Sequence, residues 1–280
     1  MSQIQPIVPL TLEGASVLHQ IFRLRWDEWQ AVDAGTRTEV VDEFRDWLTR
    51  AEAARGGSQT AAYAMLGHKG DLLLLHYRHD FTALLEAQLN VSRLRIAAYC
   101  ELVNSYLSVV ELGLYESTRK IHEELAARGL EPDTGDWEKA QQELLERQRA
   151  AMSSRLYPEV PASRYLCFYP MDRKRGEGKN WYLEPFADRQ RMMHEHGLIG
   201  RKYGGIVKQV ISGSIGFDDW EWGVDLFADD PLPFKRLIYE MRFDAASAVY
   251  ALFGAFYIGL RVKPQGFAAL MAGDARGAVE

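Results

Sequence analysis

Cysteine is scarce in this chain, with Cys100 and Cys167 as the two examples among 280 residues. Two thiols are too few for a disulfide framework, and these two form neither a CxxC nor a CxxCH pair. The sequence therefore disfavours a zinc ribbon and a covalently attached c-type haem.

Long apolar runs and secretion signals are also lacking. The N-terminal MSQIQPIVPLTLEG has no basic region followed by an apolar one, so we expect no signal peptide. The most apolar stretch, residues 245–260, is shorter than the roughly 20 residues that a bilayer requires. We expect it to form a helix end, a turn and a buried strand, in a cytoplasmic protein.

Positive charge is not in excess, since the formal net charge is −6. This balance gives no sequence-wide attraction to nucleic acid or anionic lipid. Hydrophobic residues make up 47% of the chain and charged residues 26%, as in soluble globular proteins. The length suits one large domain or two of ordinary size.

The predicted elements of the first half follow the order of one known unit. Residue periodicity, with Gly56-Gly57 as a helix stop and a turn containing Gly67 and Gly70, predicts four strands and two helices. They are a strand over Val17–Arg25, a helix over Thr38–Arg55, strands over Thr60–Leu66 and Asp71–Tyr77, a helix over Phe81–Cys100 and a strand over Ser105–Leu112. This β-α-β-β-α-β order is that of the ferredoxin-like unit.

The second half repeats the order of elements without repeating the residues. Its predicted elements are a strand over Tyr165–Met171, a helix over Pro185–Arg201, strands over Ile206–Ser212 and Glu221–Phe227, a helix over Pro233–Ala248 and a strand over Phe256–Val262. The charged, helix-forming residues 116–161 are typical of a solvated helical linker, with an interface or gating element as the alternative. We expect an α+β protein with tandem ferredoxin-like domains over residues 1–115 and 162–280, paired as a dimeric α/β barrel.

Several long runs resemble the signature of one enzyme family, in the correct order. They are CFYPMDRKRGEGKNWYLEP (167–185), HEHGLIGRKYGGIVKQVISGSIGFDDWEWGVDLFADDP (194–231) and YEMRFDAASAVYALFGAFYIG (239–259), with GHKGDLLLL and SYLSVVELG as less specific matches. The chain is thereby similar to the coproheme decarboxylases, which are chlorite-dismutase-like haem enzymes. The resemblance covers nearly the whole chain except the longer linker around residues 116–150. It implies non-covalent haem in the second domain and a homopentamer.

Two histidines, His194 and His196, lie two residues apart on a predicted helix. Side chains at this spacing project about 200° apart, so the pair cannot chelate one metal. His196 shares its face with Met192 and Ile199, whereas the neighbours of His194 are polar. Alone, a helix histidine with apolar neighbours is more often a core residue. The family's His-Gly pair before GRKY falls on His196, however, and makes it the axial ligand of the haem iron.

Tyr169, Met171 and Arg173 alternate along a predicted strand and its exit, so their side chains face the same side. By resemblance, Tyr169 is the redox-active residue whose radical attacks the substrate propionates. Met171 would line the same pocket, with an ordinary apolar filler as the alternative. Family members carry lysine where this chain has Arg173, and here a lysine follows as Lys174. Arginine can bind a propionate, but its fixed charge brings proton donation from this position into question.

Basic residues are in local excess around these positions. From Arg155 to Lys202 the chain has ten Lys or Arg against six Asp or Glu. A charge run is usually a solvated face, but a substrate with four carboxylates favours anion binding here, since guanidinium pairs well with carboxylate. By resemblance, Arg155 and Ser247 hold propionates. Trp181 lies near the pocket by the same resemblance, with a core or interface tryptophan as the alternative.

The resemblance implies peroxide-dependent oxidative decarboxylation of iron-coproporphyrin III (coproheme) to protohaem (haem b), with coproheme as substrate and redox cofactor. Gln209 matches the position where chlorite dismutases place an arginine above the distal face of the haem. An amide donates a hydrogen bond to peroxide but supplies no positive charge for chlorite. Two rivals stay open: a haem peroxidase or residual chlorite dismutase, and a non-catalytic haem-binding or haem-transfer protein. Tyr169 argues against the second, because binding alone does not need it.

The expected partners follow from this interpretation. They are coproheme, hydrogen peroxide and further copies of the chain, and transient contact with ferrochelatase is compatible with the resemblance. Neither nucleic acid nor a membrane is expected as a partner.

Overall fold

The computed structural model describes residues 8–53 and 57–279, with nine strands among them. The strands of the first half are β1 (Thr11–Leu24), β2 (Gln59–Leu66), β3 (Leu72–Arg78) and β4 (Cys100–Gly113). Those of the second half are β5 (Tyr165–Arg173), β6 (Lys208–Gly213), β7 (Trp222–Ala228), β8 (Ala251–Phe253) and β9 (Tyr257–Val262). Each strand predicted from the sequence is present, although β1 and β4 begin several residues earlier than expected, and β8 is an addition.

Eight of the described strands hydrogen-bond in a closed ring. The order is β7-β6-β4-β1-β3-β2-β9-β5, and β5 pairs again with β7 to close it. Each half has the same internal order, β4-β1-β3-β2 in the first and β9-β5-β7-β6 in the second. The halves join where β2 pairs with β9 and β4 pairs with β6. The prediction of two ferredoxin-like units that share one barrel-like body is therefore confirmed.

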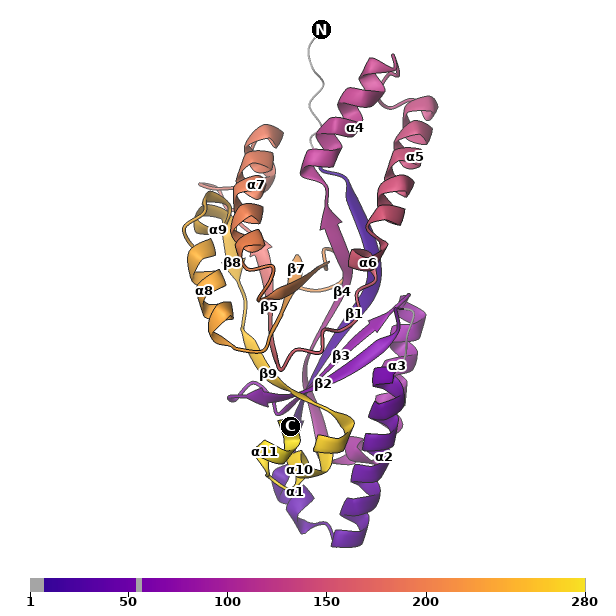
Figure 1. The fold of residues 1–280 in the computed structure, drawn as a ribbon, viewed down its shortest axis with the longest axis vertical. Coiled ribbons are helices and arrows are strands. Elements are labelled where there is room, and N and C mark those ends of the chain that lie inside the picture. Colours follow the sequence, from indigo (N-terminus) through magenta and orange to yellow (C-terminus); the bar gives the residue numbers. More distant parts are fainter. Residues whose placement is uncertain (1–7, 54–56, 280) are drawn as a thin grey trace.

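Helices cover the outside of this ring. The first half carries α2 (Ala34–Ala53) and α3 (Phe81–Arg93), preceded by the short α1 (Trp26–Ala31). The second half carries α7 (Phe186–Lys202), α8 (Leu232–Met241) and α9 (Ala245–Tyr250). Figure 1 shows α7, α8 and α9 beside the strands on the upper left and α1, α2 and α3 in the lower part of the molecule. The end predicted for the first long helix, at Arg55 and Gly56, lies outside the described residues.

The side chains of the strands sort into an inner and two outer layers. Tyr63, Tyr77 and Tyr106 point into the ring with other aromatic and aliphatic groups, and an eight-stranded ring is just wide enough to be filled in this way. Outward-facing side chains pack under α2 and α3 in the first half and under α7 and α8 in the second. Because successive strand residues point to opposite faces, Phe168 lies inside the ring and Tyr169 outside it.

The segment between the halves is helical, as predicted. It forms α4 (Tyr115–Ala127), α5 (Gly135–Ala151) and the single turn α6 (Ser153–Leu156). The first two pack on each other through Ile121, Leu125 and Trp137 and extend away from the ring (Figure 1). The third lies so close to β1 that a Cβ on Gly14 would come within 2.0 Å of the carbonyl oxygen of Leu156, so this crossing requires glycine.

Two predicted helices end earlier than their periodicity suggests. The helix expected over Phe81–Cys100 stops at Arg93 and continues as the 3-10 turn η1 (Arg95–Tyr99). The helix expected over Pro233–Ala248 is two helices, because Asp244 starts a new one. The remaining short elements are the 3-10 turns η2 (Trp181–Leu183) and η3 (Pro264–Gly266) and the helices α10 (Phe267–Met271) and α11 (Ala275–Val279). Among the described residues, no helix combines the length and apolarity needed to cross a membrane.

Candidate functional site

Helix α7 turns His196 toward the protein and His194 toward solvent. The side chain of His196 is 24% exposed, whereas His194 lies on the exposed surface. On the inner side of α7, Met192 packs with Trp181, and Ile199 joins the cluster that lies under α7 and α8. The two histidines therefore have the orientations that their neighbours in the sequence predict.

His196 is held by the first turn of α9. Its Nδ1 lies 3.0 Å from Oδ2 of Asp244 and 3.3 Å from the hydroxyl oxygen of Ser247. Asp244 is the N-cap of α9, and its other oxygen accepts the backbone N–H of Ser247 at 2.8 Å. Burial acts to raise the pKa of Asp244, but hydrogen bonds from His196 and Ser247 hold that pKa below its ordinary value.

An ionised Asp244 fixes the tautomer of His196. The carboxylate accepts a hydrogen bond from Nδ1, so in the neutral form of the ring Nδ1 carries the proton and Nε2 carries a lone pair. Within the described residues Nε2 has no hydrogen-bond partner, since the contacts of this ring are made by Nδ1. A neutral imidazole oriented by a carboxylate through its other nitrogen is the usual form of a metal-binding histidine. This donor set fits the axial position of a haem iron.

Tyr169 lies in the layer between β5 and α7–α8. It is 4% exposed, and its ring centroid lies 4.7 Å from that of Phe256 and 5.7 Å from that of Phe253. Burial raises the pKa of the phenol, and the nearby cations Arg242 and Arg173 oppose this shift without cancelling it. The phenol therefore keeps its proton at neutral pH, and it can give up an electron and that proton together.

Met171 and Gln209 reach the same outer layer from two strands. Met171 follows Tyr169 on its face of β5 and is partly buried in the same cluster. The amide nitrogen of Gln209 donates to the carbonyl oxygen of Gly200 at 3.4 Å, about one turn beyond His196 on α7. Ile211, on the same face of β6 as Gln209, is 44% exposed. The side chain of Ile211 thus leaves apolar surface open on the face of β6 that carries Gln209.

Arg173 is buried in the wall of the site. It is 6% exposed, and its Nη1 donates to the carbonyl oxygen of Ala246 at 2.9 Å. Its Nη2 lies 3.3 Å from the sulfur of Met193, and the guanidinium carbon lies 4.7 Å from the ring centroid of Trp181. Burial lowers the pKa of Arg173, although surrounding acidic groups act against this. Trp181, 2% exposed, is therefore the aromatic support on which Arg173 stacks.

Arg155 is the predicted site residue that stands apart. It lies on α6, which packs on β1 and β4, and its side chain is exposed. Within the described part of the chain, no ion pair or side-chain hydrogen bond links Arg155 to the other predicted residues. Ser247, predicted with it to hold propionates, is buried, and its hydroxyl contacts Asp244 and His196.

Sequence reasoning missed two residues of this region, Asp244 and Arg242. The guanidinium carbon of Arg242 lies 4.0 Å from the ring centroid of Phe253, beside Tyr169. Its side chain is exposed and forms no ion pair among the described residues. A signal for Asp244 was present in the sequence, because aspartate is one of the preferred residues at a helix N-cap. The continuous apolar periodicity of residues 233–248 obscured it.

The order of these elements and their residues match known proteins over most of the chain. Residues 37–262 match the family model for chlorite dismutase. The chain belongs to the chlorite dismutase family. A coproheme decarboxylase from Staphylococcus saprophyticus is 40% identical over 256 residues, which cover 91% of this chain and 94% of the relative.

Two further matches link the chlorite dismutase family fold to haem binding. A putative haem-binding protein from Natronomonas pharaonis is 40% identical over 278 residues, which are 98% of this chain and 43% of that protein. The solved structure of a haem-binding protein from Thermus thermophilus is 38% identical, with a TM-score of 0.80 over 96% of this chain and 99% of that chain. The solved structure of a mutant chlorite dismutase from Candidatus Nitrospira defluvii is 14% identical, with a TM-score of 0.68 over 93% of this chain and 96% of that chain, and shows the fold alone.

Proposed function

We propose that this protein is a coproheme decarboxylase, which uses hydrogen peroxide to convert coproheme into protohaem. The observation that carries the proposal is the position of Tyr169 and His196. They stand on β5 and α7, the two elements that border one apolar layer of the second half. Relatives 40% identical over most of the chain bear the name of this activity. The haem-carrying part of the chain would then be residues 162–280.

His196 is the residue that would hold the iron. Its Nε2 carries the free lone pair, while Asp244 keeps the ring in one orientation. Bound coproheme supplies the redox chemistry by which peroxide provides oxidising equivalents. Met171 and Trp181 would border the macrocycle, Met171 within the apolar layer and Trp181 behind Arg173.

Tyr169 is the residue that passes oxidation on to the substrate. A propionate becomes a vinyl group when it loses CO2, one proton from the carbon next to the macrocycle, and two electrons. One H2O2 with one proton accepts what is removed and leaves as two molecules of water, so each propionate consumes one peroxide. The propionates hang from the macrocycle edge, out of reach of the iron. Tyr169, as a phenoxyl radical, would take the proton and one electron from that carbon as a hydrogen atom and so regain its O–H. The second electron would be accepted by the remaining oxidising equivalent of the same peroxide as CO2 leaves.

The carboxylates of coproheme require cations or hydroxyl donors at the rim of the site. Arg242 meets this need most directly, because its guanidinium is exposed and lies beside the Tyr169–Phe253 pair. Arg155 is also exposed, on the linker side. Arg173 and Ser247 remain proposed contacts for propionates, but both also join α9 to neighbouring elements. Arg173 of β5 donates to the carbonyl of Ala246, and the hydroxyl of Ser247 lies 3.3 Å from Nδ1 of His196 on α7.

The neutral side chain of Gln209 favours peroxide over chlorite as the oxidant. Its amide is neutral, partly buried and only weakly engaged, with a hydrogen bond of 3.4 Å to Gly200. It can donate a hydrogen bond to bound peroxide, whereas it offers no cation to bind chlorite. We therefore propose that chlorite dismutation, the activity after which the family is named, is not the main activity of this protein.

One experiment tests the proposed activity against a haem carrier without catalysis. Purified protein is mixed with coproheme, peroxide is added stepwise, and the porphyrin products are followed by mass. We expect the loss of two molecules of CO2 per coproheme and the use of two molecules of peroxide. Coproheme that binds stoichiometrically but is recovered unchanged after peroxide would identify a carrier instead.

The assembly and location belong to the same proposal. We propose a homopentamer in the cytoplasm that receives coproheme during transient contact with ferrochelatase. The α4–α5 hairpin, which extends from the ring close to α7, is suited to an interface or to gating of the site (Figure 1). Sedimentation with the hairpin residues 119–149 replaced by a short loop would separate these two roles.

A further inference from the structure

A cavity lies in the first half of the molecule, between the outer faces of its strands and the helices that cover them. It has a volume of about 230 Å³ and lies between the outer faces of β1, β3 and β4 and the helices α2 and α3. Phe44, Leu74 and Ile96 are typical of its apolar lining, and no charged residue lines it. An engineered cavity of about 150 Å³ already binds benzene, so this cavity has room for a larger molecule.

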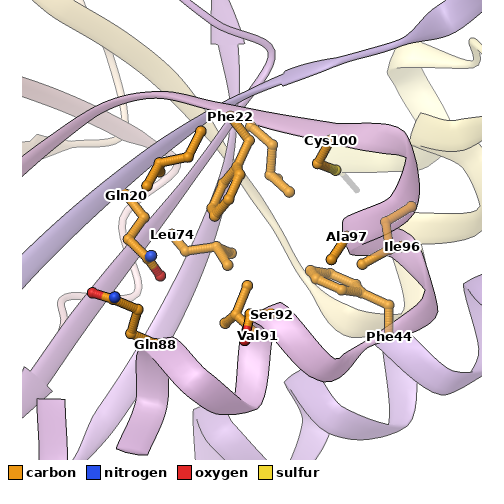
Figure 2. Close-up of a pocket in the computed structure, with 12 residues that line it drawn as sticks. Gln20, Phe22, Phe44, Leu74, Gln88, Val91, Ser92, Ile96, Ala97 and Cys100 are labelled. Carbon is orange, nitrogen blue, oxygen red and sulfur yellow. The ribbon is translucent and has the colours of Figure 1, made fainter. Parts of the chain in front are cut away.

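Two amides stand at one end of the cavity. Figure 2 shows Gln20 of β1 and Gln88 of α3 side by side there, with Phe44 and Ile96 at the other end. Gln20 is 3% exposed. Its side-chain oxygen lies 3.1 Å from Nε2 of His76, while its amide nitrogen has no partner among the described residues. Because Gln20 lines the cavity, this nitrogen is available to donate to a molecule inside it.

A directed chain of hydrogen bonds fixes the orientation of this amide. Arg78 is always a donor, and its Nη2 donates to the hydroxyl of Thr60 at 2.8 Å. Thr60 lies 2.9 Å from Nδ1 of His76, and its buried O–H has that nitrogen as its acceptor. His76 is neutral, because burial, with Arg78 and His19 acting in the same direction, lowers its pKa to about 3.

The direction of each bond then follows from the one before. With Nδ1 of His76 occupied as an acceptor, the proton is on Nε2, which donates to the oxygen of Gln20. The NH2 group of Gln20 is consequently the end that remains for the cavity. The cation of Arg78 at the far end polarises the chain and makes this NH2 a better donor.

We propose that this cavity binds a neutral, largely apolar molecule with a carbonyl oxygen, which accepts a hydrogen bond from the amide of Gln20. A donor at one end selects an acceptor on the ligand. The absence of lysine and arginine from the lining disfavours a carboxylate, because an anion buried there would be unpaired. Gln88, which is exposed at the same end, offers a second amide to the same oxygen.

Three probe molecules of similar size test the proposal on the full-length protein. Acetophenone has the carbonyl, isopropylbenzene has the same shape without an acceptor, and benzoate carries a charge. Methyl resonances of Leu74, Val91 and Ile96 report on the cavity, and those of Leu226 and Leu237 report on the second half. We expect acetophenone to move the first set alone and to bind about tenfold more tightly than isopropylbenzene, as one buried hydrogen bond allows.

Variants distinguish a hydrogen bond from the amide of Gln20 from non-specific occupation of the cavity by any apolar molecule. Gln20→Glu keeps an oxygen for His76 but presents an acceptor to the cavity, so the preference for acetophenone should disappear. Ala97→Phe, at the opposite end, should exclude both neutral probes, and Gln142→Leu on α5 should change nothing. Equal affinities for acetophenone and isopropylbenzene, or tighter binding of benzoate, would overturn the proposal. If Gln20→Glu does not fold, the wild-type ratio and Ala97→Phe decide.

Discussion

The imidazole Nδ1 of His196 and the carboxylate Oδ2 of Asp244 lie 3.0 Å apart, and this contact joins α7 to the first turn of α9. The same turn accepts a hydrogen bond from Arg173 through the carbonyl of Ala246. One short turn thus positions the proposed iron ligand and the buried cation of β5. The geometry of the site should therefore respond to changes in α9 that touch no substrate.

The first prediction concerns the two histidines of α7. His196→Ala should abolish axial ligation and change the absorption spectrum of bound coproheme. His194→Ala, the matched control on the exposed face, should leave that spectrum unchanged. Equal spectral changes in both variants would show that the orientation of α7 does not select the ligand.

The second prediction concerns Asp244. Asp244→Asn keeps the shape and the N-cap of α9 but removes the negative charge behind His196, and such changes next to a metal ligand typically cost about 10–100-fold in affinity or activity. We expect weaker iron coordination, measured by competition with free imidazole, with the fold retained by circular dichroism. Unchanged coordination would show that Asp244 acts only as the N-cap of α9.

The same carboxylate gives a pH dependence with a defined sign. The pKa of Asp244 in the folded protein is held below its ordinary value of 3.8, so its contribution to stability is present above about pH 4. This contribution is lost as the pH falls through the folded pKa. Asp244→Asn should therefore be less stable than wild type at about pH 7, and this difference should shrink as the pH falls below about 4. The measurement is the free energy of unfolding by denaturant, determined for both proteins across this pH range.

The sequence predicted the strands of the ring and the orientation of His196, but not how distant strands pair. The strands of both halves followed from residue alternation and turn residues, because each strand is buried on at least one face. The face of α7 that carries His196 followed from Met192 and Ile199. The pairing of β4 with β6 and of β2 with β9 depends on residues far apart along the chain, which local periodicity does not encode.

The features of the site that the sequence did not predict depend on tertiary contacts. Asp244 contacts His196, which lies 48 residues earlier in the chain, and such a tertiary contact is not encoded in the local sequence around Asp244. Arg173 was expected to face a propionate, and alternation on β5 gave its side correctly. Alternation along a strand does not predict that Arg173 stacks on Trp181 and donates a hydrogen bond to α9. The roles predicted for the site residues, His196 and Tyr169 among them, remain predictions.

The third prediction concerns Gln209. The unmodified protein should convert coproheme with peroxide and break down chlorite poorly. Gln209→Arg should increase oxygen release from chlorite, because it places a cation on the outer face of β6 near α7. Oxygen electrode traces measure this directly. Rapid oxygen release by the unmodified protein, with coproheme untouched by peroxide, would reverse the order of the two activities.

The fourth prediction concerns Arg173. Arg173→Ala removes a buried stack on Trp181 and leaves the carbonyl of Ala246 without its donor, which should cost about 1–3 kcal/mol of unfolding free energy. Decarboxylation should slow as well, whereas Arg173→Lys, which keeps the charge, should retain most of the activity. A fully active and stable Arg173→Ala would exclude both roles and make Lys174 the next candidate.

Tyr169→Phe tests the proposed relay most directly. Phenylalanine retains the ring and its contacts with Phe253 and Phe256, but it has no O–H to lose and form a radical. The measurement is the mass of the porphyrin products after stepwise addition of peroxide to the coproheme complex. We predict that the variant binds coproheme as wild type does, because His196 and Asp244 are unchanged, and consumes peroxide yet forms little or no protohaem. Protohaem formation at the wild-type rate would contradict the relay through Tyr169 and transfer that role to another oxidisable residue, with Trp181 the first to examine.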